Sequence, residues 1–113
     1  MKHKTYSNCS SKNISVLITK LQAYLTRQCD LEIQNSRVGD DEYQIFAMTK
    51  HDILKRMIGL NMSIYIGMKK ENRDVKVRVG NPAGPVGTGI FGAGSLHSIY
   101  NDVWTIIDNY FSQ

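Results

Sequence analysis

The sequence predicts an α+β fold, a two-layer sandwich in which two long helices cover one face of a four-stranded antiparallel sheet. Apolar residues recur at helical spacing near both ends of the 113-residue chain, and they alternate with polar residues between these two segments. The expected order of elements is α-β-β-(short α)-β-β-α. Placing both helices on one face of the sheet would bury every apolar stripe at once.

The first long helix is expected to begin at Asn13. Its apolar residues recur every three or four positions and are Ile14, Leu17, Ile18, Leu21, Tyr24 and Leu25. Ser11 or Asn13 can cap this helix, because their side chains accept hydrogen bonds from free amides of the first turn. Residues 1–12 are polar and lack such a pattern. The sequence therefore predicts a flexible polar tail over 1–12 and a single α+β domain over 13–113.

Two strands are expected after this helix. Residues 31–38 alternate weakly, and a polar turn containing Gly39 and Asp40 separates them from residues 42–49. Both faces of the second segment are partly apolar, which indicates a strand inside the sheet. A short helix is then expected at 53–58, where an aspartate precedes the segment and a glycine follows it.

The clearest alternation lies in the middle of the chain. Residues 62–69 and 75–79 each place apolar residues at every second position, and a polar turn joins them. One apolar face and one polar face predict an antiparallel hairpin covered by helices on one side only. The core residues expected from this pattern are Ile64, Ile66, Val75 and Val77.

Glycine and proline are concentrated before the last helix. Six of the nine glycines and both prolines fall between Gly80 and Gly94, so a loop is expected over 81–94. Ser95 is expected to cap the following helix, whose stripe is Leu96, Ile99, Tyr100, Val103, Ile106, Ile107 and Tyr110. The loop either packs on the core, with Phe91 as its anchor, or contacts a partner. Amides near Gly92 and Ser95 could alternatively bind a phosphate or carboxylate.

Gly87, Gly89 and Gly92 match the G-x-G-x-x-G spacing of dinucleotide-binding loops. Such a site requires a parallel β-α-β unit, with an acidic residue about 20 residues further on. In this chain the preceding strand belongs to a predicted antiparallel hairpin. The pattern therefore argues against a dinucleotide site.

Positive charge gathers in the predicted hairpin. The net charge is +4, and five of the fourteen lysines and arginines fall within residues 69–80. Tyr65, Lys76 and Arg78 are expected on the outer face of the sheet. An aromatic ring beside cations is typical of proteins that bind single-stranded nucleic acid. The simpler interpretation is a solvated strand face.

The chain offers little for catalysis. Three histidines and two cysteines lack metal-ligand spacing, and His51 and Asp52, as sequence neighbours, seldom face one another. We expect no enzyme activity, no cofactor and no metal. We expect no membrane span, because no apolar run approaches about 18–20 residues. A cytoplasmic location is expected, because the first residues lack the apolar segment of a secretory signal.

The sequence therefore predicts a small non-catalytic binding module that contacts another protein through a sheet edge or the 81–94 loop. A homodimer is expected, because Phe46 and Tyr65 would make the uncovered sheet face more apolar than a monomer favours. The candidate contact residues are Tyr65, Lys76, Arg78, Ile90, Phe91, Gly92 and Ser95. The alternative is a binder of an anionic ligand, nucleic acid or phosphate, through the basic hairpin 69–80 and the glycine-rich loop 80–95. Nucleic acid is the less favoured partner.

Overall fold

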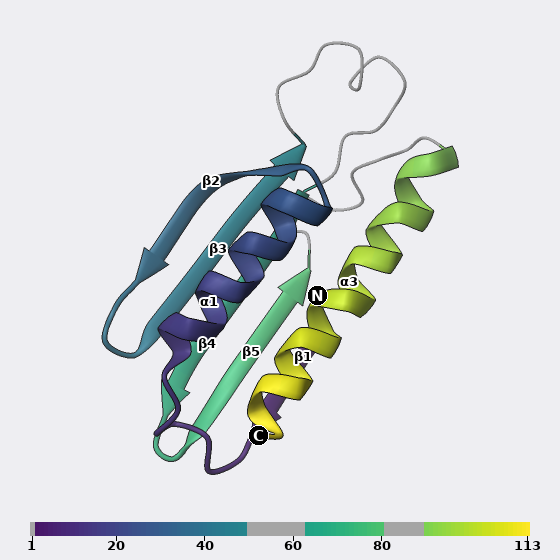
Figure 1. The fold of residues 1–113 in the computed structure, drawn as a ribbon. Coiled ribbons are helices and arrows are strands. Elements are labelled where there is room, and N and C mark those ends of the chain that lie inside the picture. Colours follow the sequence, from purple (N-terminus) through teal and green to yellow (C-terminus); the bar gives the residue numbers. More distant parts are fainter. Residues whose placement is uncertain (1, 50–62, 81–89) are drawn as a thin grey trace.

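The computed structural model describes residues 2–49, 63–80 and 90–113. It shows a five-stranded antiparallel sheet in the order β1-β5-β4-β3-β2, with two helices on one face (Figure 1). The described elements are β1 (Lys2–Tyr6), α1 (Ile14–Ala23), β2 (Leu31–Val38), β3 (Glu42–Thr49), β4 (Ser63–Glu71), β5 (Asp74–Gly80) and α3 (Ile90–Phe111). The predicted α+β class is confirmed, whereas the predicted number of four strands is wrong. The short helix expected at 53–58 lies outside the described residues.

The additional strand is β1, so the prediction of a flexible tail over 1–12 is wrong for this segment. β1 pairs with β5 at one edge of the sheet. Its helix-facing side chains are lysines and a tyrosine instead of aliphatic residues. The Lys2 ammonium lies 5.2 Å from the centre of the Trp104 ring, and the Tyr6 ring stacks on Phe111 with centroids 4.4 Å apart. Because a cation–π contact and a ring stack make this packing, a search for apolar alternation misses the strand.

The first helix forms as predicted. The Asn13 side chain caps α1 by accepting a hydrogen bond from the Ser15 amide, and the predicted stripe from Ile14 to Leu25 is buried except for the half-buried Tyr24. The helix continues into a π-helical turn, Tyr24–Gln28. Asp30 then takes a left-handed conformation, with φ 56°, and the chain turns into β2.

The two predicted hairpins are confirmed, and β3 lies inside the sheet between β2 and β4, as its two apolar faces indicate. The turn between β4 and β5 contains Asn72 at φ 58°, a conformation that asparagine tolerates better than most residues. The β2–β3 register shifts between Ile33 and Asn35, which leaves Gln34 as an extra residue. This bulge lies on an edge strand.

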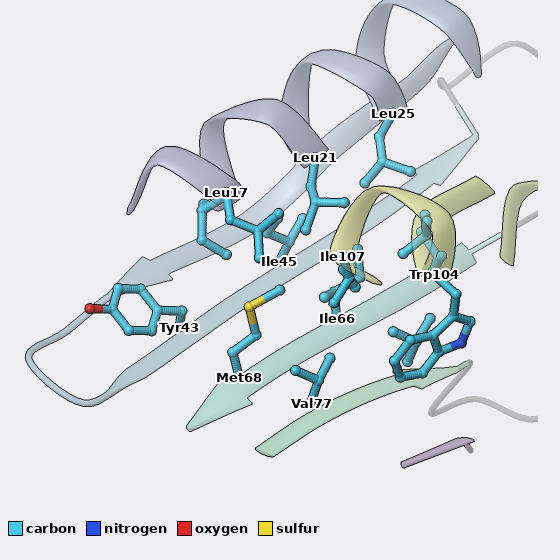
Figure 2. Packing of buried hydrophobic residues seen from close by; sticks show 14 of the residues in the cluster. Leu17, Leu21, Leu25, Tyr43, Ile45, Ile66, Met68, Val77, Trp104 and Ile107 are labelled. Atoms are coloured by element: carbon cyan, nitrogen blue, oxygen red, sulfur yellow. The ribbon is translucent and has the colours of Figure 1, made fainter. Parts of the chain in front are cut away.

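The core lies between the sheet and the two helices. Ile64, Ile66, Val75 and Val77, which the alternation predicts as core residues, are at most 1% exposed. Leucines of α1 cover β3, and Ile107 and Trp104 of α3 cover β4 and β5 (Figure 2). The predicted face of the central hairpin is therefore confirmed.

The last helix starts earlier than predicted. α3 begins at Ile90, so Ser95 lies inside the helix and is not its N-cap, and residues 90–94 are helical instead of looped. For residues 90–96 the structure describes only the backbone. A helix can extend through glycines, because each added residue gains a hydrogen bond while a glycine costs only about 1 kcal/mol relative to alanine.

The buried face of α3 agrees in part with the predicted stripe. Ile99, Val103 and Ile107 are buried as expected. Trp104 and Phe111 are also buried, although the predicted stripe omits them. Their rings lie toward β1, where they contact the lysines and the tyrosine of that strand. The sequence prediction omits Trp104, Phe111 and β1 for the same reason, because these rings pack on that strand.

Candidate functional site

Both described helices lie on the same side of the sheet, so in the described part of the chain no helix covers the other side (Figure 1). We call this side the open face. The strand register identifies the side chains on it, because residues paired across strands share a face. Those used below are His3 on β1, Gln44 and Phe46 on β3, Tyr65 and Lys69 on β4, and Lys76 and Arg78 on β5.

Gly67 shapes the middle of the open face. A Cβ atom at this position would lie 2.7 Å from the hydroxyl oxygen of Tyr65 and 3.0–3.1 Å from two of its ring carbons. The Tyr65 side chain therefore extends along its strand and lies over the Gly67 backbone. A glycine inside a strand often marks such a close approach. The tyrosine ring is held against the sheet because residue 67 has no side chain.

A hollow of about 320 Å³ opens beside this ring. We call it the Tyr65 hollow. It is lined by residues of β1, β3, β4 and β5, including His3, Gln44, Tyr65, Gly67, Lys69, Lys76 and Arg78. Arg78 lies directly opposite Gly67 in the strand register, and its guanidinium carbon is 5.9 Å from the centre of the Tyr65 ring. The ring and the guanidinium together form one wall of the hollow.

Cations outnumber carboxylates around the hollow. Lys69, Lys76 and Arg78 line it together with one acidic residue, Glu42, whose carboxylate is 3.9 Å from the Lys69 ammonium. Lys4 also lines the hollow, but its ammonium bonds to a carboxylate on the helix side. An anionic group or a hydrogen-bond acceptor therefore meets a net positive charge here.

The two lysines have carboxylate neighbours, whereas Arg78 contacts an aromatic ring. Lys76 lies 3.0 Å from Glu71, and the hydrogen bond from Lys76 lowers the pKa of that carboxyl group. Both lysine pairs are well exposed, and such pairs contribute little to stability. Arg78 makes no ion pair with any residue that the structure describes. Its guanidinium is therefore the cation of the hollow best placed to bind a partner.

The structure brings together three of the seven predicted contact residues. Tyr65, Lys76 and Arg78 all line the Tyr65 hollow. The other four, Ile90, Phe91, Gly92 and Ser95, belong to the first turns of α3, which packs on the opposite side of the sheet. α3 starts at Ile90, so the amides of 94–96 lie inside the helix, whereas Gly92 lies in its first turn, where amides have no partner within the helix. An anion site at these amides stays a prediction. Residues 81–89 of the predicted loop lie outside the described part of the chain.

Gly67, His3 and Gln44 are among the lining residues that sequence reasoning missed. Gly67 stands in the alternating pattern as a small outward residue, and its closeness to Tyr65 depends on the tyrosine rotamer. His3 reaches the hollow only because β1 joins the sheet, and Gln44 because β3 lies beside β4. A glycine two positions after an aromatic residue in a strand is the one signal that the sequence offered.

A second polar cluster lies on the helix side, where Asp108 of α3 joins β1. Lys4 Nζ donates to Asp108 Oδ1 at 2.6 Å, and the Tyr6 hydroxyl donates to the same oxygen. Partial burial opposes ionisation of Asp108, but these two hydrogen bonds outweigh it and lower the pKa of the carboxyl group. Burial and the carboxylate raise the pKa of the Tyr6 hydroxyl. Every group in this cluster has a partner, so we interpret it as a structural tie.

The two cysteines are free thiols in different surroundings. Burial raises the pKa of the half-buried Cys29 thiol, which disfavours the nucleophilic thiolate. Cys9 is buried next to α3 and is also free. Within residues 2–49, 63–80 and 97–113, no three His, Cys, Asp or Glu side chains gather in a way that could hold a metal ion.

Comparison with known proteins does not narrow the function. No protein-family model matches the chain, and a search of curated proteins finds no match. None of the described helices is both long enough and apolar enough to cross a bilayer. A cytoplasmic location stays a prediction from the sequence.

Proposed function

We propose that this protein is a small non-catalytic binding module that contacts another protein through its open face, with the Tyr65 hollow at the centre of the contact. The observation that carries this proposal is the wall formed by Tyr65 and Arg78 over Gly67. Tyrosine and arginine are among the residues that most often dominate the energy of protein interfaces. A concave centre lined by these two side chains suits a projecting side chain of a partner.

The surroundings of the hollow support the same proposal. Lys69, Lys76 and Glu42 form a charged rim, and the half-buried Phe46 lies directly across from Tyr65 in the strand register. Interfaces commonly combine an aromatic centre with a polar rim. Because strands of a sheet hold these side chains, little ordering is needed on binding, and rigid elements position a contact well.

The test is the capture of a protein partner by immobilised protein. We expect wild type to retain a protein partner even after nuclease treatment. Tyr65→Ala and Arg78→Ala should each retain at least about tenfold less of it, because truncating a residue at the centre of an interface costs about 2 kcal/mol or more of binding free energy. Arg27→Ala is the matched control, because Arg27 is an exposed arginine on the helix side. Equal retention by Arg78→Ala and Arg27→Ala would exclude the open face as the contact surface.

A second candidate function is the binding of an anionic ligand, nucleic acid or phosphate. The excess of cations around the hollow favours it, and the Tyr65 ring offers a surface on which a base could stack. A labelled single-stranded oligonucleotide and inorganic phosphate test this alternative. Binding that weakens steeply with added salt, and that Arg78→Ala abolishes, would favour the anionic ligand over a protein.

A further inference from the structure

β2 is an edge strand of the sheet in the described part of the chain. It pairs with β3 on one side, and no described strand pairs with its other side. The last five residues of β2, from Gln34 to Val38, are all exposed. Val38 is 56% exposed, and together with Val16 it is one of the two exposed large hydrophobic side chains among residues 2–49, 63–80 and 97–113. The edge of a sheet is a template for pairing with another strand.

The bulge in β2 changes which of its side chains share a face. Glu32 pairs with Met48, whereas Arg37 pairs with Gln44, four residues earlier on β3. Met48 and Gln44 lie on one face of β3, so Glu32 and Arg37 also share the open face. In a strand without a bulge, residues five positions apart would point to opposite faces. The extra residue Gln34 therefore brings an acid and a base onto the same face.

This arrangement makes the β2 edge complementary to itself. We propose that two copies of the chain pair through antiparallel β2 strands, with the two-fold axis between Gln34 and Asn35. Glu32 of each copy then lies opposite Arg37 of the other, on the open face. Oppositely charged residues placed directly across antiparallel strands attract one another. One register thus gives two ion pairs related by symmetry.

The helix-side positions agree with the same register. Leu31, Ile33, Ser36 and Val38 all face the helices, because their partners on β3 lie on that face. Antiparallel pairing about the proposed axis places Leu31 opposite Val38 and Ile33 opposite Ser36. Each of these four residues then meets a residue on its own face. The exposed Val38 gains an apolar neighbour, and two five-stranded sheets become one continuous sheet.

The proposal goes beyond the protein-binding function of the open face and does not depend on it. Its partner is a second copy of this chain, and its surface is the β2 edge. A contact between two strand edges buries less area than a standard protein interface. We therefore expect a reversible, concentration-dependent dimer, which is detectable at about 100 μM or above.

Charge exchange tests this register. Glu32→Arg places arginine opposite arginine, and Arg37→Glu places glutamate opposite glutamate. We expect each single variant to raise the dissociation constant of the dimer about tenfold or more in sedimentation equilibrium, because two attractive pairs become two repulsive ones. The double variant, Glu32→Arg with Arg37→Glu, restores opposite charges and is expected to restore the dimer. Arg27→Glu is the control and should leave association unchanged.

Three results would overturn the proposal. The first is a monomer at all concentrations, and the second is a double variant that associates no better than the single ones. The third is an association that Arg78→Ala abolishes and Glu32→Arg leaves intact, which would place the contact on the open face. All these side chains are exposed in the monomer, so we expect each variant to fold. A cooperative thermal unfolding transition for each variant checks this.

Discussion

Val77 illustrates how single residues stabilise the sheet. Its side chain is 1% exposed and points from β5 into the core (Figure 2), so its methyl groups lie in a closely packed interior. We expect Val77→Ala to lower the free energy of unfolding by about 1–3 kcal/mol, from lost burial and the cavity that remains.

The matched control for this change is Val38→Ala. Val38 is a valine on another strand of the same sheet, but its side chain is 56% exposed. Its truncation should change the free energy of unfolding by about 0.5 kcal/mol or less. Urea unfolding of both variants, at low protein concentration, checks the pair. Equal losses would mean that the assigned burial of the two valines is wrong.

For single residues, the sequence predicts the face to which a side chain points but not its rotamer. Alternation alone places Tyr65, Lys76 and Arg78 on one face, because the direction of a strand side chain depends only on its position. The orientation of the Tyr65 ring depends on the space above Gly67 and on Arg78 across the strand pair. Those contacts follow from register and rotamer, which single-sequence patterns do not contain.

Among the elements, β1 and α3 depend on one another. Asp108 connects them through hydrogen bonds from Lys4 and Tyr6, and the Tyr6 ring stacks on Phe111. The pKa of Asp108 is lowered in the folded protein from its ordinary value of 3.8. A lowered pKa means that the fold favours the ionised form. This stabilisation is present above the unfolded-state pKa and is lost as pH falls through the folded-state pKa.

Asp108→Asn tests this tie between elements. We expect the variant to be less stable than wild type at pH 7, and the difference in free energy of unfolding to shrink as pH falls below about 4, where wild type loses the charge as well. The difference at pH 7 is expected to be modest, about 1 kcal/mol, because the Lys4–Asp108 pair is more than 40% exposed. Urea unfolding between pH 7 and pH 2.5 gives both curves. A difference that stays constant with pH would contradict an ionised, hydrogen-bonded Asp108.

The sequence predicts an element correctly where apolar residues recur with the period of that element, and it fails where the residues that face the helices are polar. Both hairpins and the first helix follow from clear apolar periodicity. β1 has strand geometry with exposed lysines on its helix-facing side, so its packing depends on contacts of their ammonium groups across about 100 residues of sequence. The start of α3 was missed because glycine lowers local helix propensity, while the long downstream helix compensates for it.

In the whole molecule, the two surfaces proposed for binding are separate. The Tyr65 hollow lies over β1, β3, β4 and β5, whereas β2 contributes no residue to it and forms the far edge. A dimer joined through β2 would therefore leave both hollows uncovered. Both helices lie on the other side of the sheet (Figure 1), so they too leave the open face available to a partner.

The central claim is that a protein partner binds the open face at the Tyr65 hollow, and Gly67→Ala tests it most directly. The added methyl group would contact the end of the Tyr65 side chain, which can swing away because it is flexible, so the fold should tolerate the change. We predict a free energy of unfolding within about 1 kcal/mol of wild type, together with at least a tenfold loss of partner retention as the ring leaves its position. Retention equal to wild type by a stably folded Gly67→Ala variant would contradict the account.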